Sequence, residues 1–144
     1  MSAFKDNLLA GKTAFVAGGT SGINLGIAQR YAALGAKVAV AGRNPEKAAA
    51  SAKSVGADAL GLSCDVRDYG AIRRALEEAT GKLGPLDIVV SGAAGNFLAG
   101  ALDMSANGFR TVVDIDLNGT FNVFRACYDL LKRPGASLIA ITAG

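Results

Sequence analysis

The stretch of sequence that decides the fold is Thr13-Ala14-Phe15-Val16-Ala17-Gly18-Gly19-Thr20-Ser21-Gly22-Ile23-Asn24-Leu25-Gly26. Residues 13–17 form a short apolar run that is typical of a buried strand, and the glycines after them end it. A helix is expected from about Gly22 to Leu34, with Gly35 as the residue that stops it. A strand, a glycine-rich turn and a helix in this order begin a unit of parallel strands joined through helices.

The same alternation continues along the rest of the chain. Asn44 and Asp68 have side chains that cap helix starts, and Gly81 and Pro134-Gly135 are expected to end helices. Parallel pairing with right-handed connections favours the strand order 3-2-1-4-5. We therefore predict an α/β fold with a doubly wound parallel sheet, the Rossmann fold, over residues 1–144. The remaining strands are expected at 37–41, 59–63, 86–90 and 137–141, and the remaining helices at 46–54, 69–80 and 105–132.

Composition excludes several classes of protein. The chain has 144 residues, of which 51% are hydrophobic and 19% charged, so it is not a disordered chain. No apolar run approaches the roughly 18 residues that span a bilayer, so no membrane partner is expected. The net charge of +3 is not gathered into one block, so we expect no nucleic-acid partner.

Histidine and cysteine usage bounds the chemistry. The sequence contains no His, which excludes histidine metal sites and Ser-His-Asp triads. Cys64 and Cys127 have neither metal-ligand spacing nor the pattern of a disulfide framework, so no metal is expected. Reduced thiols, and an N-terminus without the features of a signal peptide, favour a cytoplasmic location.

The glycine-rich turn indicates a dinucleotide-binding site. Gly18 and Gly22 would let a pyrophosphate approach the backbone, and a helix N-terminus attracts its negative charge. Thr20 and Ser21 add hydroxyl donors, and Ile23 completes the set expected to bind the cofactor here. The alternative is an ordinary strand-to-helix turn that is rich in glycine.

Together with Asp65 after the third strand and the Ala/Gly loop after the fourth, this turn resembles the short-chain dehydrogenase/reductase family. The family pattern is Thr-Gly-x-x-x-Gly-x-Gly, and this chain has Ala17 in place of the Thr and Asn24 in place of the last Gly. The resemblance implies a nicotinamide dinucleotide cofactor. It also implies a homo-oligomer that associates through the long helix from Ser105 to Lys132, whose apolar arc is wider than one sheet face can bury.

The end of the second strand favours NADP(H) over NAD(H). An acidic side chain there would bind the adenosine ribose and repel a 2′-phosphate. The sequence has Arg43 instead, whose guanidinium suits a phosphate. The alternative is an ordinary solvated surface arginine.

The resemblance assigns further cofactor-binding residues. It places Asp65 and Val66 at the adenine, although Asp is also common as a turn residue that binds its own backbone. The family usually has Asn-Asn-Ala-Gly after strand four, and this chain has Ser91, Gly92 and Ala93 at the start of that loop. These three residues are expected to line the cofactor.

Two segments resemble the 2,4-dienoyl-CoA reductase branch of the family. They are Ala93-Ala94-Gly95-Asn96-Phe97 and Asp114-Ile115-Asp116-Leu117-Asn118-Gly119-Thr120-Phe121. The resemblance implies an enoyl or dienoyl thioester substrate and a place in fatty acid metabolism. Asn96 and Phe97 would then lie near the nicotinamide and the acyl chain; alternatively Phe97 is a core aromatic and Asn96 a turn residue.

Asp116 is the candidate catalytic residue. On an ideal helix it lies opposite the polar stripe, and a carboxylate on an apolar face is costly unless something holds it. The family has an active-site Asn at this position, so Asp116 is expected to hold a water, orient a catalytic Lys or deliver a proton. The alternative is a buried, hydrogen-bonded structural Asp.

The family's proton donor, a Tyr with a Lys four residues later, would lie beyond the fifth strand. The sequence ends at Gly144, and the family's Ser position corresponds to Ala143, next to Thr142. We therefore expect the N-terminal part of a longer reductase, unable by itself to transfer hydride. The alternatives are a 3-oxoacyl or secondary-alcohol oxidoreductase of the same family and a non-catalytic dinucleotide-binding module.

Overall fold

A computed structural model describes residues 5–142, and its strands form one parallel sheet. The predicted order 3-2-1-4-5 is confirmed. Val16 of the central strand pairs with Val40 on one side and Val90 on the other, so β1 is enclosed by neighbours. From one edge to the other the strands are β3 (Leu60–Ser63), β2 (Lys37–Gly42), β1 (Thr13–Ala17), β4 (Ile88–Ser91) and β5 (Ser137–Ala140).

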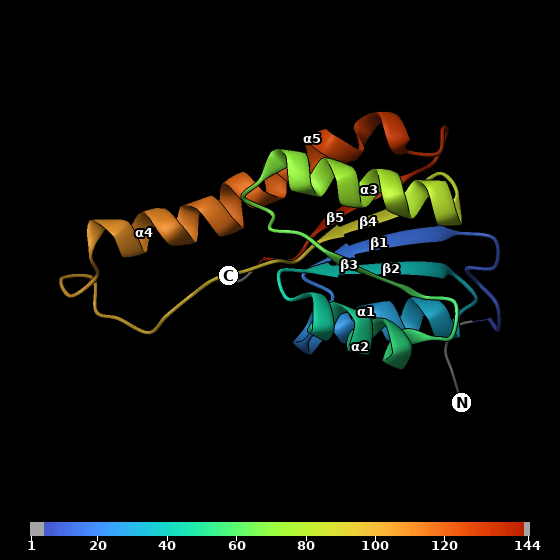
Figure 1. The fold of residues 1–144 in the computed structure, drawn as a ribbon, viewed down its shortest axis with the longest axis horizontal. Coiled ribbons are helices and arrows are strands. Elements are labelled where there is room, and N and C mark those ends of the chain that lie inside the picture. Colours follow the sequence, from blue (N-terminus) through green and yellow to red (C-terminus); the bar gives the residue numbers. More distant parts are fainter. Residues whose placement is uncertain (1–4, 143–144) are drawn as a thin grey trace.

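Helices cover both faces of the sheet (Figure 1). One face carries α1 (Gly22–Ala33) and α2 (Pro45–Val55), and the other carries α3 (Tyr69–Leu83) and α5 (Gly119–Cys127). Alternate β1 side chains supply the two cores, because successive residues of a strand point to opposite faces. Val16 packs with the α1 and α2 side, and the fully buried Phe15 packs with the α3 and α5 side.

The predicted helix caps are present. The side chain of Asn44 accepts a hydrogen bond from the Lys47 backbone N–H at 2.7 Å, and Asp68 caps α3 in the same way. Gly35 follows α1 with φ +94°, the left-handed conformation in which glycine commonly ends a helix. The two caps fix where α2 and α3 begin, next to the carboxyl ends of β2 and β3.

The prediction that Gly81 ends α3 was wrong. The helix continues to Leu83, and Gly84 with φ +98° ends it. A glycine inside a helix costs only about 1 kcal/mol relative to alanine. Leu83 packs against the core and its carbonyl accepts a hydrogen bond from the Thr13 hydroxyl, so the last turn is stabilised by tertiary contacts.

The long segment predicted as one helix over 105–132 is not uniform. It begins with α4 (Ala106–Val113), widens into a π-helical turn at Asp114–Asn118, continues as α5, and ends in a 3-10 turn at Tyr128–Leu130. A π-turn holds more residues per turn than an α-helix, so the ideal-helix angles used for Asp116 do not apply. Asp116 lies inside this turn and is exposed, and so is its neighbour Leu117, so the apolar face expected around Asp116 does not enclose its carboxylate.

β4 begins at Ile88, two residues after its expected start at Leu86. Leu86 instead forms an isolated bridge with Leu131, and Asp87 lies between Leu86 and the strand. The Asp87 carboxylate, 5% exposed, accepts the Thr13 backbone N–H at 3.0 Å and the Lys12 ammonium at 3.1 Å. It therefore links the start of β1 to the start of β4, at the edge of the sheet opposite the carboxyl ends of the strands.

Large apolar side chains remain exposed on the long helical segment, as its wide apolar arc predicted. We call Phe109, Leu117, Phe121 and Tyr128 the exposed helix face; their exposed fractions are 61%, 67%, 64% and 56%. The neighbouring strand β5 is also exposed along its length. No helix within residues 5–142 is long and apolar enough to cross a membrane.

Candidate functional site

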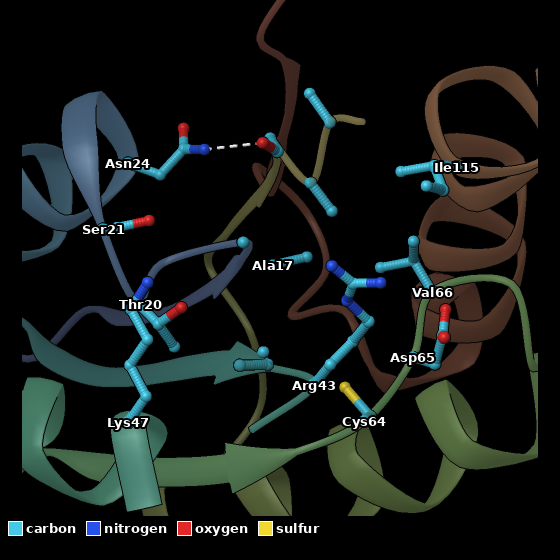
Figure 2. Close-up of a pocket in the computed structure, with 16 residues that line it drawn as sticks. Ala17, Thr20, Ser21, Asn24, Arg43, Lys47, Cys64, Asp65, Val66 and Ile115 are labelled. Atoms are coloured by element: carbon cyan, nitrogen blue, oxygen red, sulfur yellow. Dashed lines mark hydrogen bonds between the residues drawn. The ribbon is translucent and has the colours of Figure 1, made fainter. Parts of the chain in front are cut away.

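A cavity of about 270 Å³ lies where the strands β1 to β4 end (Figure 2). Its walls come from the turn between β1 and α1, the end of β2, the residues after β3 and the loop after β4. This is the edge at which open α/β sheets bind their ligands. The predicted cofactor-binding residues that line it are Gly18, Thr20, Ser21, Arg43, Asp65, Val66, Gly92 and Ala93.

The two key glycines of the turn have different roles. Gly18 has φ +75°, and a Cβ on it would lie 2.6 Å from the Ala93 backbone nitrogen, so it permits close packing against the loop after β4. Gly22 has φ +57°, and a Cβ on it would meet nothing within 4 Å. The space expected for a ligand to approach the protein backbone is therefore present at Gly22. At Gly18 the loop after β4 occupies the position of a Cβ.

The start of α1 presents donors to the cavity. Ser21 is extended and makes no side-chain capping bond, so the first N–H groups of the helix keep their capacity to bind an anion. Such a helix end carries partial positive charge. Ser21 and Asn24 bring this end of α1 to the cavity wall.

One end of the cavity is basic. Arg43 and Lys47 both line it, and neither takes part in the ion pairs formed within residues 5–142. Gly42 allows Thr20 to lie close, since a Cβ there would come within 2.7 Å of the Thr20 methyl carbon. Two cations without a carboxylate partner suit a phosphate. The sequence analysis did not identify Lys47, because the face that a residue in the first turn of a helix presents depends on how the helix packs.

Asp65 also lines the cavity, and its neighbour Arg67 holds its carboxylate. The Arg67 guanidinium and backbone N–H both donate to the carboxylate, which is the turn geometry expected as the alternative for Asp65. Hydrogen bonding from the Arg67 side chain, with added attraction from Arg43, lowers the pKa of Asp65. The carboxylate is therefore ionised at neutral pH and available as an acceptor.

The remaining wall of the cavity is apolar. Val66 and Ile115 line it, and Gly119 of α5 lets Val66 pack closely, because a Cβ at Gly119 would lie 2.6 Å from Val66 Cγ2. Cys64 is also part of the lining, and burial raises the pKa of its thiol to about 11. It is therefore a protonated filler at neutral pH, as expected.

Several predicted residues lie outside the cavity lining. Ile23 is 75% exposed, Gly22 starts α1, and Ser91 is buried with its hydroxyl bonded to Thr120 Oγ1 at 3.1 Å. Contacts between these three residues and a cofactor stay predictions. The position of Ala143 lies outside the described residues.

Asp116, Asn96 and Phe97 lie together beyond the cavity. Asp116 Oδ1 accepts the Gly95 backbone N–H at 2.9 Å, so the carboxylate holds the loop in which Asn96 and Phe97 follow. Phe97 is 49% exposed, which excludes the alternative that it is a core aromatic, and its ring lies against Gly108 of α4. Asp116 is exposed and hydrogen-bonded, so it is not the buried Asp of the alternative, and its catalytic role stays a prediction.

Comparison with known proteins gives a consistent picture. The sequence model of the family described as short chain dehydrogenase matches residues 12–144. The chain is 42% identical over 154 residues to a peroxisomal 2,4-dienoyl-CoA reductase of Arabidopsis thaliana, covering 99% of this chain and 52% of that protein. It is 40% identical over 145 residues to the corresponding reductase of Rattus norvegicus, covering 97% and 50%. The chain thus spans about half the length of these curated relatives.

Solved structures of the same kind match the fold. A citronellol catabolism dehydrogenase of Pseudomonas aeruginosa superposes with a TM-score of 0.87 at 30% identity, covering 96% of this chain and 59% of that one. A short chain dehydrogenase of Bacillus anthracis gives a TM-score of 0.83 at 33% identity, covering 90% and 56%.

Proposed function

Because the chain belongs to the short-chain dehydrogenase family, we propose that it forms the NADP(H)-binding part of a reductase that acts on enoyl or dienoyl thioesters. The observation that carries the proposal is the cavity at the strand ends. It combines an open helix N-terminus, an ionised carboxylate and two cations that form no ion pair within the described residues, which are the groups that a phosphorylated dinucleotide needs.

Each part of the cofactor has a matching group of residues in the cavity. Arg43 and Lys47 would bind the 2′-phosphate, with the Thr20 hydroxyl beside them. Asp65 and Val66 would flank the adenine, and the start of α1 would bind the pyrophosphate. The open space in front of Gly22 leaves room for that approach. When bound, the cofactor supplies a hydride, and the chain's own residues orient it and exclude water.

The substrate class is supported by the loop after β4 and by the relatives. The loop Ala93-Ala94-Gly95-Asn96-Phe97 leads away from the cavity, and Asp116 holds it through Gly95. The relatives at 42% and 40% identity are named as 2,4-dienoyl-CoA reductases. We therefore place Asn96 and Phe97 beside the acyl chain and Asp116 near the proton-transfer step. This reading favours a dienoyl thioester over the keto substrates of the alternative oxidoreductases.

The cofactor assignment is tested by titrating the protein with NADPH and NADH. We expect tighter binding of NADPH, and a loss on the order of tenfold or more for NADPH when Arg43→Ala or Lys47→Ala removes one charge-assisted contact. NADH binding should change little in both variants. Arg110→Ala, an exposed arginine on α4, and Lys53→Ala, an exposed lysine on α2, are the matched controls. An equal loss for both cofactors would refute the 2′-phosphate role.

The substrate assignment is tested in the complete protein by following NADPH oxidation. We expect turnover of a 2,4-dienoyl-CoA and little turnover of a 3-oxoacyl-CoA of the same length. The opposite preference would favour the 3-oxoacyl or secondary-alcohol alternative. NADPH binding without turnover of either substrate would favour a non-catalytic module.

Assembly and location complete the proposal. The exposed helix face brings four large apolar side chains of the long helical segment to the surface, which suits a second copy of the chain. A cytoplasmic location stays a prediction, since two relatives carry "peroxisomal" in their names. A fluorescent fusion of the complete protein would distinguish the two compartments.

A further inference from the structure

Two positions at which this chain departs from the family's usual pattern touch each other. Asn24 replaces the last glycine of the turn motif, and Gly92 replaces an Asn after strand four. The fold brings them together from α1 and from the loop after β4. Asn24 Nδ2 donates a hydrogen bond to the Gly92 carbonyl oxygen at 2.6 Å, as Figure 2 shows.

Asn24 fits in its place because residue 92 has no side chain. A Cβ on Gly92 would lie 2.5 Å from Asn24 Cγ, and closer still to both terminal atoms of the amide. No real side chain tolerates such a contact without displacement. Asn24 thus occupies the space from which a side chain at Gly92 is missing, so the two departures compensate sterically.

Helix stability does not account for Asn24. Its side chain is only 9% exposed, and its Oδ1 has no hydrogen-bond partner within residues 5–142. A buried acceptor without a partner is destabilising, and Asn is a weak helix former. Among the described residues, the hydrogen bond to the loop is the only one that its amide makes, so the effect that offsets this destabilisation is the position of the loop.

The same short segment is fixed from other sides as well. The Gly92 backbone N–H donates to the Ala17 carbonyl at 3.0 Å, and Gly18 packs against Ala93. Asn24 adds the only side-chain hydrogen bond to Gly92 among the described residues. It therefore sets how far the start of α1 stands from the loop that continues toward Asn96 and Phe97.

We infer that Asn24 is a positioning residue that acts through Gly92. The pair sets the width of the cavity between the pyrophosphate-binding start of α1 and the loop after β4. It therefore governs the fit of the pyrophosphate and nicotinamide part of the cofactor. The adenosine 2′-phosphate part is expected at Arg43 and Lys47, which come from the end of β2 and from α2, whereas the pair joins α1 to the loop after β4. We therefore expect binding of the 2′-phosphate part to be independent of the pair. This inference rests on the proposed binding of NADP(H).

The test compares two probes, NADPH and adenosine 2′-monophosphate, on four proteins. Gly92→Asn introduces the clash, and Asn24→Asp removes the donor while keeping the shape. Each should raise the Kd of NADPH on the order of tenfold. The double exchange Asn24→Gly with Gly92→Asn moves the amide to the other side of the contact and should return the Kd to within about threefold of the unmodified protein. The Kd of adenosine 2′-monophosphate should stay within about twofold in all variants.

The outcomes separate this inference from the proposed function. Additive losses in the double exchange, or a double exchange that fails to fold, would overturn the compensation. An equal loss of affinity for both probes would show that Asn24 supports the fold as a whole and does not position the loop. If Gly92→Asn alone does not fold, Asn24→Asp and the double exchange still decide. An unmodified protein that binds neither probe would refute NADP(H) binding itself, and this inference with it.

Discussion

At the scale of single residues, the cavity shows which side chains a sequence motif can locate. Thr20, Arg43 and Asp65 follow strand ends, and strand ends of a parallel sheet meet at one edge, so their convergence was predictable. Lys47 and Asn24 lie inside helices, where the face that a residue presents depends on how the helix packs. Their contribution to the lining therefore required the three-dimensional structure.

Asp116 gives a prediction at the same scale. The variants Asp116→Ala and Asp116→Asn should both lower kcat of the complete protein with a dienoyl-CoA, by roughly 100-fold or more, if the carboxylate takes part in proton delivery. The Kd of NADPH should stay within about twofold, because Asp116 lies outside the cavity lining. The measurement is steady-state kinetics across pH, with NADPH titration as the control.

Asparagine separates two roles for this side chain. Its amide oxygen could still accept the Gly95 N–H that Asp116 holds at 2.9 Å. Full activity in Asp116→Asn together with a loss in Asp116→Ala would limit the role of Asp116 to fixing the loop.

At the scale of elements, local sequence signals predicted where helices begin better than they predicted how far each helix continues without interruption. The caps Asn44 and Asp68 and the stop at Gly35 behave as expected, because each acts through bonds to its immediate neighbours. The end of α3 and the π-turn at Asp114–Asn118 did not follow from local propensity. Contacts made across the fold stabilise both, such as the bonds from Thr13 to Leu83 and from Gly95 to Asp116.

Asp87 links two elements, and its charge predicts a pH dependence of stability. Burial alone would raise the pKa of Asp87, but the Thr13 N–H and the Lys12 and Lys132 ammonium groups outweigh it and lower the pKa. A depressed carboxylate pKa stabilises the fold above the ordinary value near 4, and this stability is lost as the pH falls through the lower folded value.

The matching variant is Asp87→Asn, which keeps an acceptor but removes the charge. It should lower the free energy of unfolding by about 1–2 kcal/mol at pH 7, and the difference from the unmodified protein should shrink below about pH 4. Urea denaturation at pH 7 and pH 3 measures it, with the exposed Asp58→Asn as control. A difference that stays constant over this range would contradict an electrostatic origin.

At the scale of the whole molecule, the long helical segment carries part of the apolar surface that the fold leaves exposed. Phe109, Leu117 and Phe121 are each more than half exposed, although the sheet and α3 bury other residues of the same segment, such as Val123 and Cys127. Monomers rarely leave a contiguous apolar surface of this kind open to water. A two-fold arrangement would place the same helix face of two copies against each other.

The exposed helix face therefore predicts association between copies of the chain. Introducing a charge into a desolvated interface is strongly unfavourable, so Leu117→Glu and Phe121→Glu should each convert a dimer or larger oligomer into a monomer at micromolar concentration. Light scattering coupled to size-exclusion chromatography measures the mass. Leu8→Glu is the control, because Leu8 is 51% exposed but lies in the turn before β1, away from this face. An unmodified protein that is already monomeric, or glutamate variants that keep its mass, would show that the face is covered in another way.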